Sequence, residues 1–222
     1  MAIKLIVRVD DCGQALIQDR PDEGLEIFSR WWDAGSWAMT PIYVGVVPVV
    51  VFPPAIVKMF GAELIALHGW DHADQPLSPD HIHLAHRALP SARVVIPPYN
   101  KYNEDTFRAM RDYGLTTLLG GFPSEHHQFG ATPVMHAGIL HLSARRGLYG
   151  RCYELVDAVK RVIATEDCPY PIQVVLHHRW DMSNPDFLPG VRKLRELIEP
   201  HVVTVDAARK WAEENQLKGR AT

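Results

Sequence analysis

The sequence predicts an α/β fold in which a parallel sheet curls into a compact or incomplete barrel. Short apolar runs alternate with longer amphipathic stretches almost from end to end, which is the pattern of strands and helices that alternate around a parallel sheet. Seven or eight such units occupy 222 residues, fewer than the roughly 250 of a complete eight-stranded barrel. No low-complexity linker or internal repeat divides the chain, so residues 1–222 are expected to form a single domain.

Strands are expected where the apolar runs are short, and helices where apolar residues recur with helical spacing. The predicted strands are 3–9, 41–47, 63–67, 93–96, 116–119, 138–142, 172–176 and 202–205. The predicted helices are 23–34, 53–60, 79–88, 103–113, 151–164, 186–198 and 206–216. Ser78-Pro79 and Asn103 supply helix starts, and Gly35 and Gly114 fall where two helices should end. Segment 120–150 is the least regular and is expected to form loops on one face.

The composition limits the classes of partner. A formal charge of −3 without long runs of one sign gives no reason to expect nucleic acid or an anionic membrane as a partner. No stretch has the length and apolarity of a membrane-spanning helix, and the N-terminus enters a strand pattern rather than a signal peptide, which favours the cytoplasm. The three cysteines, Cys12, Cys152 and Cys168, lack a C-x-x-C pair and predict neither a disulfide framework nor a thiolate zinc site.

The first candidate site lies in "IVRVDDCG" (6–13), where Asp10 and Asp11 follow an apolar run. Catalytic groups of an α/β barrel come from the carboxyl ends of its strands. Adjacent like charges are unfavourable there unless a cation or a proton intervenes, and a solvated loop or helix cap is the alternative explanation. Because alternation turns neighbouring side chains to opposite faces of a strand, the strand is expected to end at this pair, with Gly13 permitting the turn.

The second candidate site is "ELIALHGWDHAD" (63–74), which carries His68 and His72 at a spacing that sets both imidazoles on one face of a helical turn. Gly69 stands where a metalloprotease helix would have glutamate, so a protease is disfavoured. With Asp11 as a third ligand, the set would leave positions open on zinc or a similar ion. Such an ion acidifies water and polarises a carbonyl, with Asp10 near enough to act as the base. A chance pair among twelve histidines is the competing interpretation.

Two further strand ends add polar groups. In "RVVIPPYNKYN" (93–103) two prolines stiffen the backbone, and the Tyr99 N–H is presented to a developing oxyanion. In "PIQVVLHHRWD" (171–181) either His177 or His178 could face the pocket as a general acid, and strand alternation disfavours both doing so.

Together these motifs, in this order from residue 9 to about 181, resemble the polysaccharide deacetylases of the NodB-homology type, carbohydrate esterase family four. The family's T-F-D-D-G resembles Val9-Asp10-Asp11-Cys12-Gly13, its H-S/T-x-x-H resembles His68 to His72, its R-P-P-Y resembles Ile96-Pro97-Pro98-Tyr99, and its L-x-H resembles Leu176-His177-His178. The resemblance implies a distorted seven-stranded parallel (β/α) barrel of the glycoside hydrolase and deacetylase type, and a metal-dependent deacetylase acting on an amide or ester bond.

The resemblance also implies a role for each matched residue. Asp10 would be the base, Tyr99 would bind the oxyanion, and His178 is favoured over His177 as the acid. The metal would be zinc, with cobalt, nickel and iron as alternatives, held by the ligands Asp11, His68 and His72. The candidates for substrate binding are Leu176, as a wall of the acetyl pocket, with Pro98, Trp70 and Trp180.

Three departures from the family pattern point to a divergent branch. Ile96 stands where the family has an arginine that holds the catalytic aspartate, and Gly69 replaces a small hydroxyl residue. No D-x-x-D-W stretch orients His178, although Asp181 is nearby. The expected substrate is a small acylated sugar, an oligosaccharide or a related metabolite, and the sequence predicts no oligomeric state. A chitooligosaccharide-type deacetylase and a non-catalytic binding protein that keeps the barrel are the alternatives.

Overall fold

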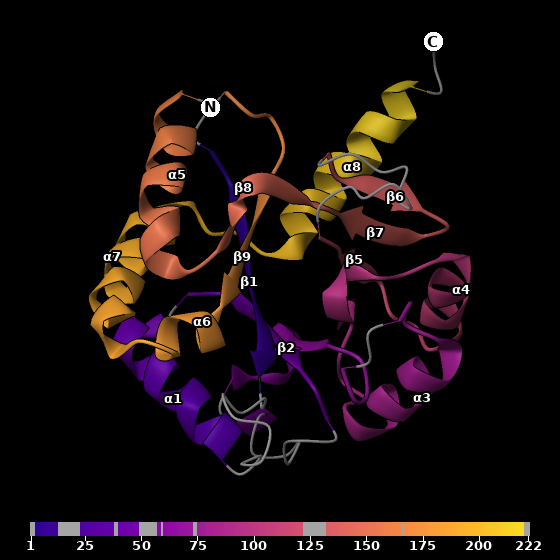
Figure 1. The fold of residues 1–222 in the computed structure, drawn as a ribbon. Coiled ribbons are helices and arrows are strands. Elements are labelled where there is room, and N and C mark those ends of the chain that lie inside the picture. The colour runs from indigo at the N-terminus through magenta and orange to yellow at the C-terminus, as the bar shows by residue number, and fades with distance from the viewer. Residues whose placement is uncertain are drawn as a thin grey trace.

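The computed structural model describes residues 3–12, 23–37, 40–48, 57–58, 60–72, 75–121, 132–165 and 167–219, which build an α/β fold around one curled sheet (Figure 1). The strands are β1 Leu5–Cys12, β2 Ile42–Val46, β3 Ile65–Leu67, β4 Val94–Val95, β5 Thr117–Leu119, β6 Val134–His136, β7 Ile139–Leu142, β8 Ala144–Gly150 and β9 Ile172–His177. Their order across the sheet is β6-β7-β5-β4-β3-β2-β1-β9-β8. All neighbours are parallel except β6 and β7. Within the described residues β6 and β8 do not pair, so the sheet is an open, barrel-like curl.

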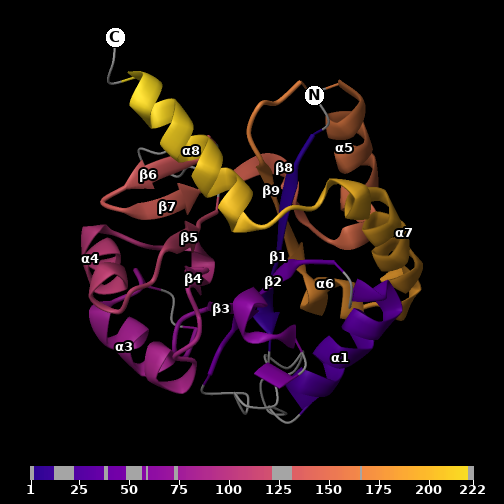
Figure 2. The same ribbon diagram turned by 180° about the vertical axis from the view of Figure 1, so that it is seen from behind.

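The helices lie around the outside of this sheet, except α8, which packs against the inner face of the curl (Figures 1 and 2). They are α1 Glu23–Gly35, α3 Pro79–Ala88, α4 Glu104–Asp112, α5 Cys152–Thr165, α6 His178–Met182, α7 Leu188–Ile198 and α8 Val205–Gly219, with 3-10 turns η2 Ala62–Leu64, η3 Pro98–Asn100, η4 Pro185–Phe187 and η5 Glu199–His201. In Figure 2, α8 runs beside β6 and β7, which it contacts. None of the described helices combines the length and apolarity needed to cross a bilayer.

The residues predicted to start and end helices cap them in the structure. The Ser78 hydroxyl accepts a hydrogen bond from the His81 N–H at 3.3 Å at the start of α3. The Asn103 side chain accepts one from the Thr106 N–H at 3.0 Å, while the Thr106 hydroxyl accepts the Asn103 N–H, so a capping box opens α4. Gly114 follows α4 with φ 65°, the left-handed geometry that glycine provides at helix ends.

Strand β1 divides its side chains between two apolar layers. Leu5, Val7 and Val9 belong to the large core between the sheet and the outer helices. Ile6 points the other way, into a smaller cluster on the inner face of the curl that α8 closes with Val205. Because strand side chains alternate, Arg8 and Asp10 continue the inward row that Ile6 begins. The inner face therefore becomes polar toward the carboxyl end of β1.

The predicted α/β class and curled parallel sheet are confirmed, whereas the described residues form nine strands and not seven. Segment 120–150, predicted as loops, contains β6, β7 and β8, of which only β7 was expected. The β6–β7 hairpin turns at Ala137 and Gly138, both with positive φ (50° and 83°), and alanine gives no sequence signal for such a turn. β8 pairs irregularly with β9, and this break in register obscures strand alternation.

Two other elements differ from the prediction. The expected strand 202–205 is a single bridge between Val202 and Leu5, and α8 begins at Val205. The short helix α6 follows β9 directly and was not predicted. Of the predicted helix 53–60, only 57, 58 and 60 are described, and these are helical. Gly13 lies outside the described residues.

Candidate active site

Asp10 and Asp11 both reach the carboxyl edge of the sheet because strand alternation breaks between them. β1 continues to Cys12 and does not end at the pair, but its register against β2 shifts between Val9 and Cys12. Asp11 has φ 66°, a left-handed conformation that aspartate tolerates better than most residues. The break in alternation therefore lies within β1, at Asp11.

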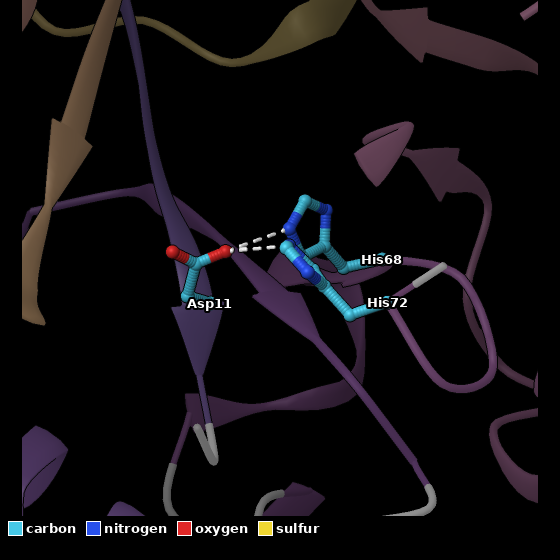
Figure 3. Close-up of side chains that lie close together, drawn as sticks. All are labelled: Asp11, His68 and His72. Carbon is cyan, nitrogen blue, oxygen red and sulfur yellow. Dashed lines mark hydrogen bonds and ion pairs between the residues drawn. The ribbon is translucent and has the colours of Figure 1, made fainter. Parts of the chain in front are cut away.

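Asp11, His68 and His72 converge on one point (Figure 3). The Asp11 Oδ1 atom lies 3.0 Å from His68 Nε2 and 2.9 Å from His72 Nε2. Each residue offers one ligand atom, and these atoms lie within 4.8 Å of one another. The segment from His68 to His72 is a loop and not the predicted helical turn; its positive φ at Gly69 (72°) and His72 (59°) brings the two imidazoles together.

The hydrogen bonds of His68 determine which of its ring nitrogens can face a cation. His68 Nδ1 lies 2.8 Å from the Ile96 carbonyl oxygen, which only accepts, so Nδ1 carries a proton and donates it. Nε2 then faces Asp11 either with a second proton or with its lone pair toward a cation. Burial lowers the pKa of His68, but the hydrogen bond to Asp11 and the charges of Asp10 and Asp11 outweigh this and raise it.

Asp11 is held as a carboxylate by its neighbours. Burial raises the pKa of this group, but contacts with His177, His68 and His72 outweigh burial and bring the pKa well below its usual range. An anionic oxygen between two imidazoles is the donor set that suits zinc and similar ions. The residues present therefore fit a divalent metal.

Gly69 has no room for the hydroxyl residue of the family pattern. A Cβ atom there would lie 2.8 Å from Pro98 Cγ, and φ 72° disfavours any L side chain. The rigid Pro97-Pro98 rim thus packs against the loop that positions His72. This departure from the family has a steric cause and leaves the two histidines in place.

Asp10 is paired with a buried arginine that is not among the predicted site residues. Arg8 Nη2 donates to Asp10 Oδ2 at 3.0 Å and to Asn100 Oδ1 at 2.7 Å. Its Nη1 donates to the Leu119 carbonyl and to the Gly120 carbonyl at 3.3 Å. A signal was present in the sequence, since Arg8 and Asp10 are two positions apart and therefore share one face of a mainly apolar strand.

His177, and not His178, lies beside the two aspartates. His177 is the register partner of Asp10 in the parallel pair β1–β9. Its Nε2 is 3.9 Å from Asp10 Oδ2, and its Nδ1 is 3.4 Å from Asp11 Oδ2. The indole of Trp180 stacks on the His177 ring at 4.2 Å, and Tyr149 meets it edge-on at 4.8 Å. Two aromatic rings therefore fix the orientation of this imidazole.

His178 is fully buried on the outer side of the sheet. Its ring packs edge-on against Phe28 at 4.9 Å and Trp31 at 6.3 Å, and its Nδ1–H donates to the Asp10 backbone carbonyl at 3.0 Å. Asp181, which is nearby in sequence, instead accepts hydrogen bonds from Trp31 Nε1 and the Cys152 N–H. The packing turns His178, the favoured acid of the prediction, away from the carboxylates, and His177 is the imidazole that lies beside them.

Replacing His178 with asparagine is expected to make the metal-free protein less sensitive to acid. Burial lowers the pKa of His178 to about 4, whereas an unfolded histidine titrates near ~6.5. As the pH falls, the unfolded chain therefore binds this proton before the folded chain does. The free energy of unfolding has its full value above pH ~6.5 and decreases by up to about 3 kcal/mol as the pH drops toward 4. The asparagine side chain would keep a donor for the Asp10 carbonyl without titrating. Urea unfolding at pH 7.5 and 4.5 measures the difference; equal pH dependence in both proteins would contradict the prediction.

Of the other predicted site residues, some border the site and one does not reach it. The exposed Tyr99 ring (55%) packs on His72 at 4.8 Å, and Trp180 is 40% exposed beside His177, so both border the site. Pro98 is buried behind Gly69. Trp70 is half-buried in the histidine loop. Leu176 is the register partner of Val9 and belongs to the outer core, so the structure does not bring it to the site.

Backbone strain gathers at this edge of the sheet. Of the six non-glycine residues with positive φ in the described part of the chain, four surround the candidate site: Asp11, His72, Tyr99 and Asn100. Such conformations cost about 1–3 kcal/mol each and persist where the surroundings determine them. Their concentration here indicates a preorganised functional site.

The sequence matches no family model and no curated protein. The fold, in contrast, is found among solved structures at low identity. A protein of Mycobacterium smegmatis assigned as a polysaccharide deacetylase aligns with a TM-score of 0.63 at 13% identity, over 98% of this chain and 92% of its own. A family 4 carbohydrate esterase from Streptomyces lividans, solved with acetate, aligns with a TM-score of 0.51 at 11% identity, over 92% and 93%. BA3943 of Bacillus anthracis, a family 4 pseudoenzyme, aligns with a TM-score of 0.53 at 12% identity, over 93% and 66%.

These likenesses confirm the resemblance at the level of the fold. The chain has the architecture of the polysaccharide deacetylases, and that architecture occurs both in a family 4 esterase and in a pseudoenzyme. Activity on this architecture depends on the residues at the site and not on the fold alone.

Proposed function

We propose that this protein is a metal-dependent hydrolase that removes an acetyl or other acyl group from an N- or O-acylated sugar or a related small molecule. The observation that carries the proposal is the convergence of Asp11, His68 and His72 on one point, with Asp10 and His177 beside them. Five polar groups from three strand ends meet where this fold presents its loops.

Asp11, His68 and His72 would hold the ion, and zinc suits their one oxygen and two nitrogen donors. When bound, a divalent ion supplies a Lewis acid that polarises an acyl carbonyl and acidifies water. The ion would also neutralise the charge of Asp11, because the Arg8 guanidinium is already paired with Asp10.

The remaining groups supply proton transfer and orientation. Asp10 accepts the proton of the attacking water, and its Oδ1, buried and without a partner among the described residues, is the atom for this. His177 donates a proton to the leaving amine or alkoxide. The Tyr99 backbone N–H binds the developing oxyanion, and the exposed rings of Tyr99 and Trp180 border the space for the rest of the substrate.

Acetate release tests the proposal directly. Protein purified without a histidine tag is analysed for metal and then assayed, with and without added zinc, on a panel of N- and O-acetylated sugars. We expect zinc-dependent turnover in the wild type and a kcat lower by about 10²–10⁴-fold in Asp10→Asn. Zinc binding without any turnover would favour a non-catalytic binding protein, and undiminished turnover by Asp10→Asn would exclude Asp10 as the base.

A further inference from the structure

We propose that Arg8 is the positioning residue for Asp10: it fixes the carboxylate through one oxygen and leaves the other free to accept a proton. The inference rests on the proposed function in taking Asp10 as the base. It concerns a residue on β1, whereas the family pattern would have supplied an arginine at the position of Ile96.

Ile96 cannot hold the Asp10 carboxylate in this chain. Its side chain is fully buried in the inner apolar cluster beside residues such as Ile6 and Leu119. Its backbone contributes elsewhere, because the Ile96 carbonyl accepts the Nδ1–H of His68. The support for Asp10 must therefore come from another part of the fold.

Arg8 provides that support with both ends of its guanidinium. Nη2 donates to Asp10 Oδ2 and to Asn100 Oδ1, while Nη1 donates to the carbonyls of Leu119 and Gly120 at the end of β5. The arginine thus crosses the inside of the curled sheet from β1 to β5 and is fully buried. A planar group held at four points has little freedom, so its donor to Asp10 is fixed in direction.

The partner of Arg8 on η3 is itself held in place. A Cβ atom at Gly121 would lie 2.1 Å from Asn100 Cγ, so the Asn100 side chain fills the space that this glycine leaves open. The Asn100 side chain also hydrogen bonds to Tyr149, whose ring packs on His177. One network therefore links the support of Asp10 to the ring that lies beside both aspartates.

The consequence for Asp10 is a division between its two oxygens. Oδ2 receives the Arg8 donor at 3.0 Å, whereas Oδ1 is buried and has no hydrogen-bond partner within the described part of the chain. A buried carboxylate oxygen without a partner is costly unless a ligand or water completes it. Arg8 thereby occupies Oδ2 and leaves Oδ1 as the oxygen available to accept a proton.

The test combines a double-mutant cycle with crystal structures. We expect Arg8→Met to lower kcat by about 100-fold, the cost of a displacement near 1 Å at a reacting group, with KM and zinc affinity changed little. In the Asp10→Asn background the same change should cost almost nothing, because the residue that Arg8 positions has already lost its function. An equal further loss in that background, or a loss of zinc affinity, would overturn the proposal and assign Arg8 a general structural role.

The crystal structures give a result that does not depend on activity. In Arg8→Met the Asp10 carboxylate should rotate away from its wild-type position, and an unmoved carboxylate would overturn the inference even if no acylated substrate is turned over. If Arg8→Met does not fold, Arg8→Lys replaces it, because one ammonium keeps the charge but cannot span Asp10 and the β5 carbonyls. A displaced Asp10 in Arg8→Lys is then the expected result, and a fixed one the contrary result.

Discussion

Replacing Asp11 with asparagine is expected to weaken zinc binding by at least about 100-fold while leaving the fold intact. Asp11 is the anionic member of the cluster, and both His68 Nε2 and His72 Nε2 lie within 3.0 Å of its Oδ1. Even residues that only orient metal ligands change affinity by about 10–100-fold when mutated, so loss of the charged ligand should cost more. Isothermal titration of metal-free protein with zinc measures the effect.

Asparagine is the informative substitution because of the backbone at this position. Asn tolerates φ 66° as Asp does, whereas Ala would add strain and confuse stability with binding. Asp71→Asn is the matched control: it removes the same charge from the loop between the two histidines, but Asp71 lies toward His81, at 3.6 Å. Zinc affinity should be unchanged in Asp71→Asn. Wild-type zinc affinity in Asp11→Asn would show that these three residues are not a metal site.

Local features of this protein are predictable from its sequence, and features that depend on distant packing are not. The helices α3 and α4 follow from Ser78 and Asn103, whose caps act within three residues. The convergence of His68 and His72 with Asp11 follows from their place after strands of a parallel sheet, although the loop conformation between the histidines does not. The pairing of Arg8 with Asp10 has a local signal in their shared strand face, but the contacts of Arg8 with carbonyls more than 100 residues away cannot be derived from local pattern.

The choice between His177 and His178 shows what alternation leaves undetermined. Because side chains alternate along a strand, the two imidazoles are expected on opposite faces of the sheet, but alternation does not determine which of them faces inward. The pairing of Asp10 with His177 determines it, because register partners in parallel strands lie on the same face. A weaker signal existed in the sequence: Gln173 is the one polar residue within that strand before the histidines, and it lies four positions before His177. Its side chain donates to the Gly120 carbonyl on the inner face, as Arg8 does.

Replacing His177 with glutamine is therefore expected to lower kcat by about 10²–10⁴-fold, the range for loss of a general acid, with little change in KM. Glutamine retains a flat polar group to lie against Trp180 but cannot deliver a proton to a leaving group. The loss should shrink for substrates with a better leaving group, such as aryl acetates, because these need less protonation. Steady-state kinetics on an acetylated sugar and on an aryl acetate measure both effects.

His178→Asn is the matched control for His177→Gln. It removes the neighbouring imidazole, which packs against Phe28 and Trp31 and contacts the site only through the Asp10 backbone carbonyl. We expect its kcat to stay within about tenfold of the wild type, with the same dependence on the leaving group. If His178→Asn instead lost activity with poor leaving groups while His177→Gln kept it, the proton would come from His178, and the packing of that ring would have to change during turnover.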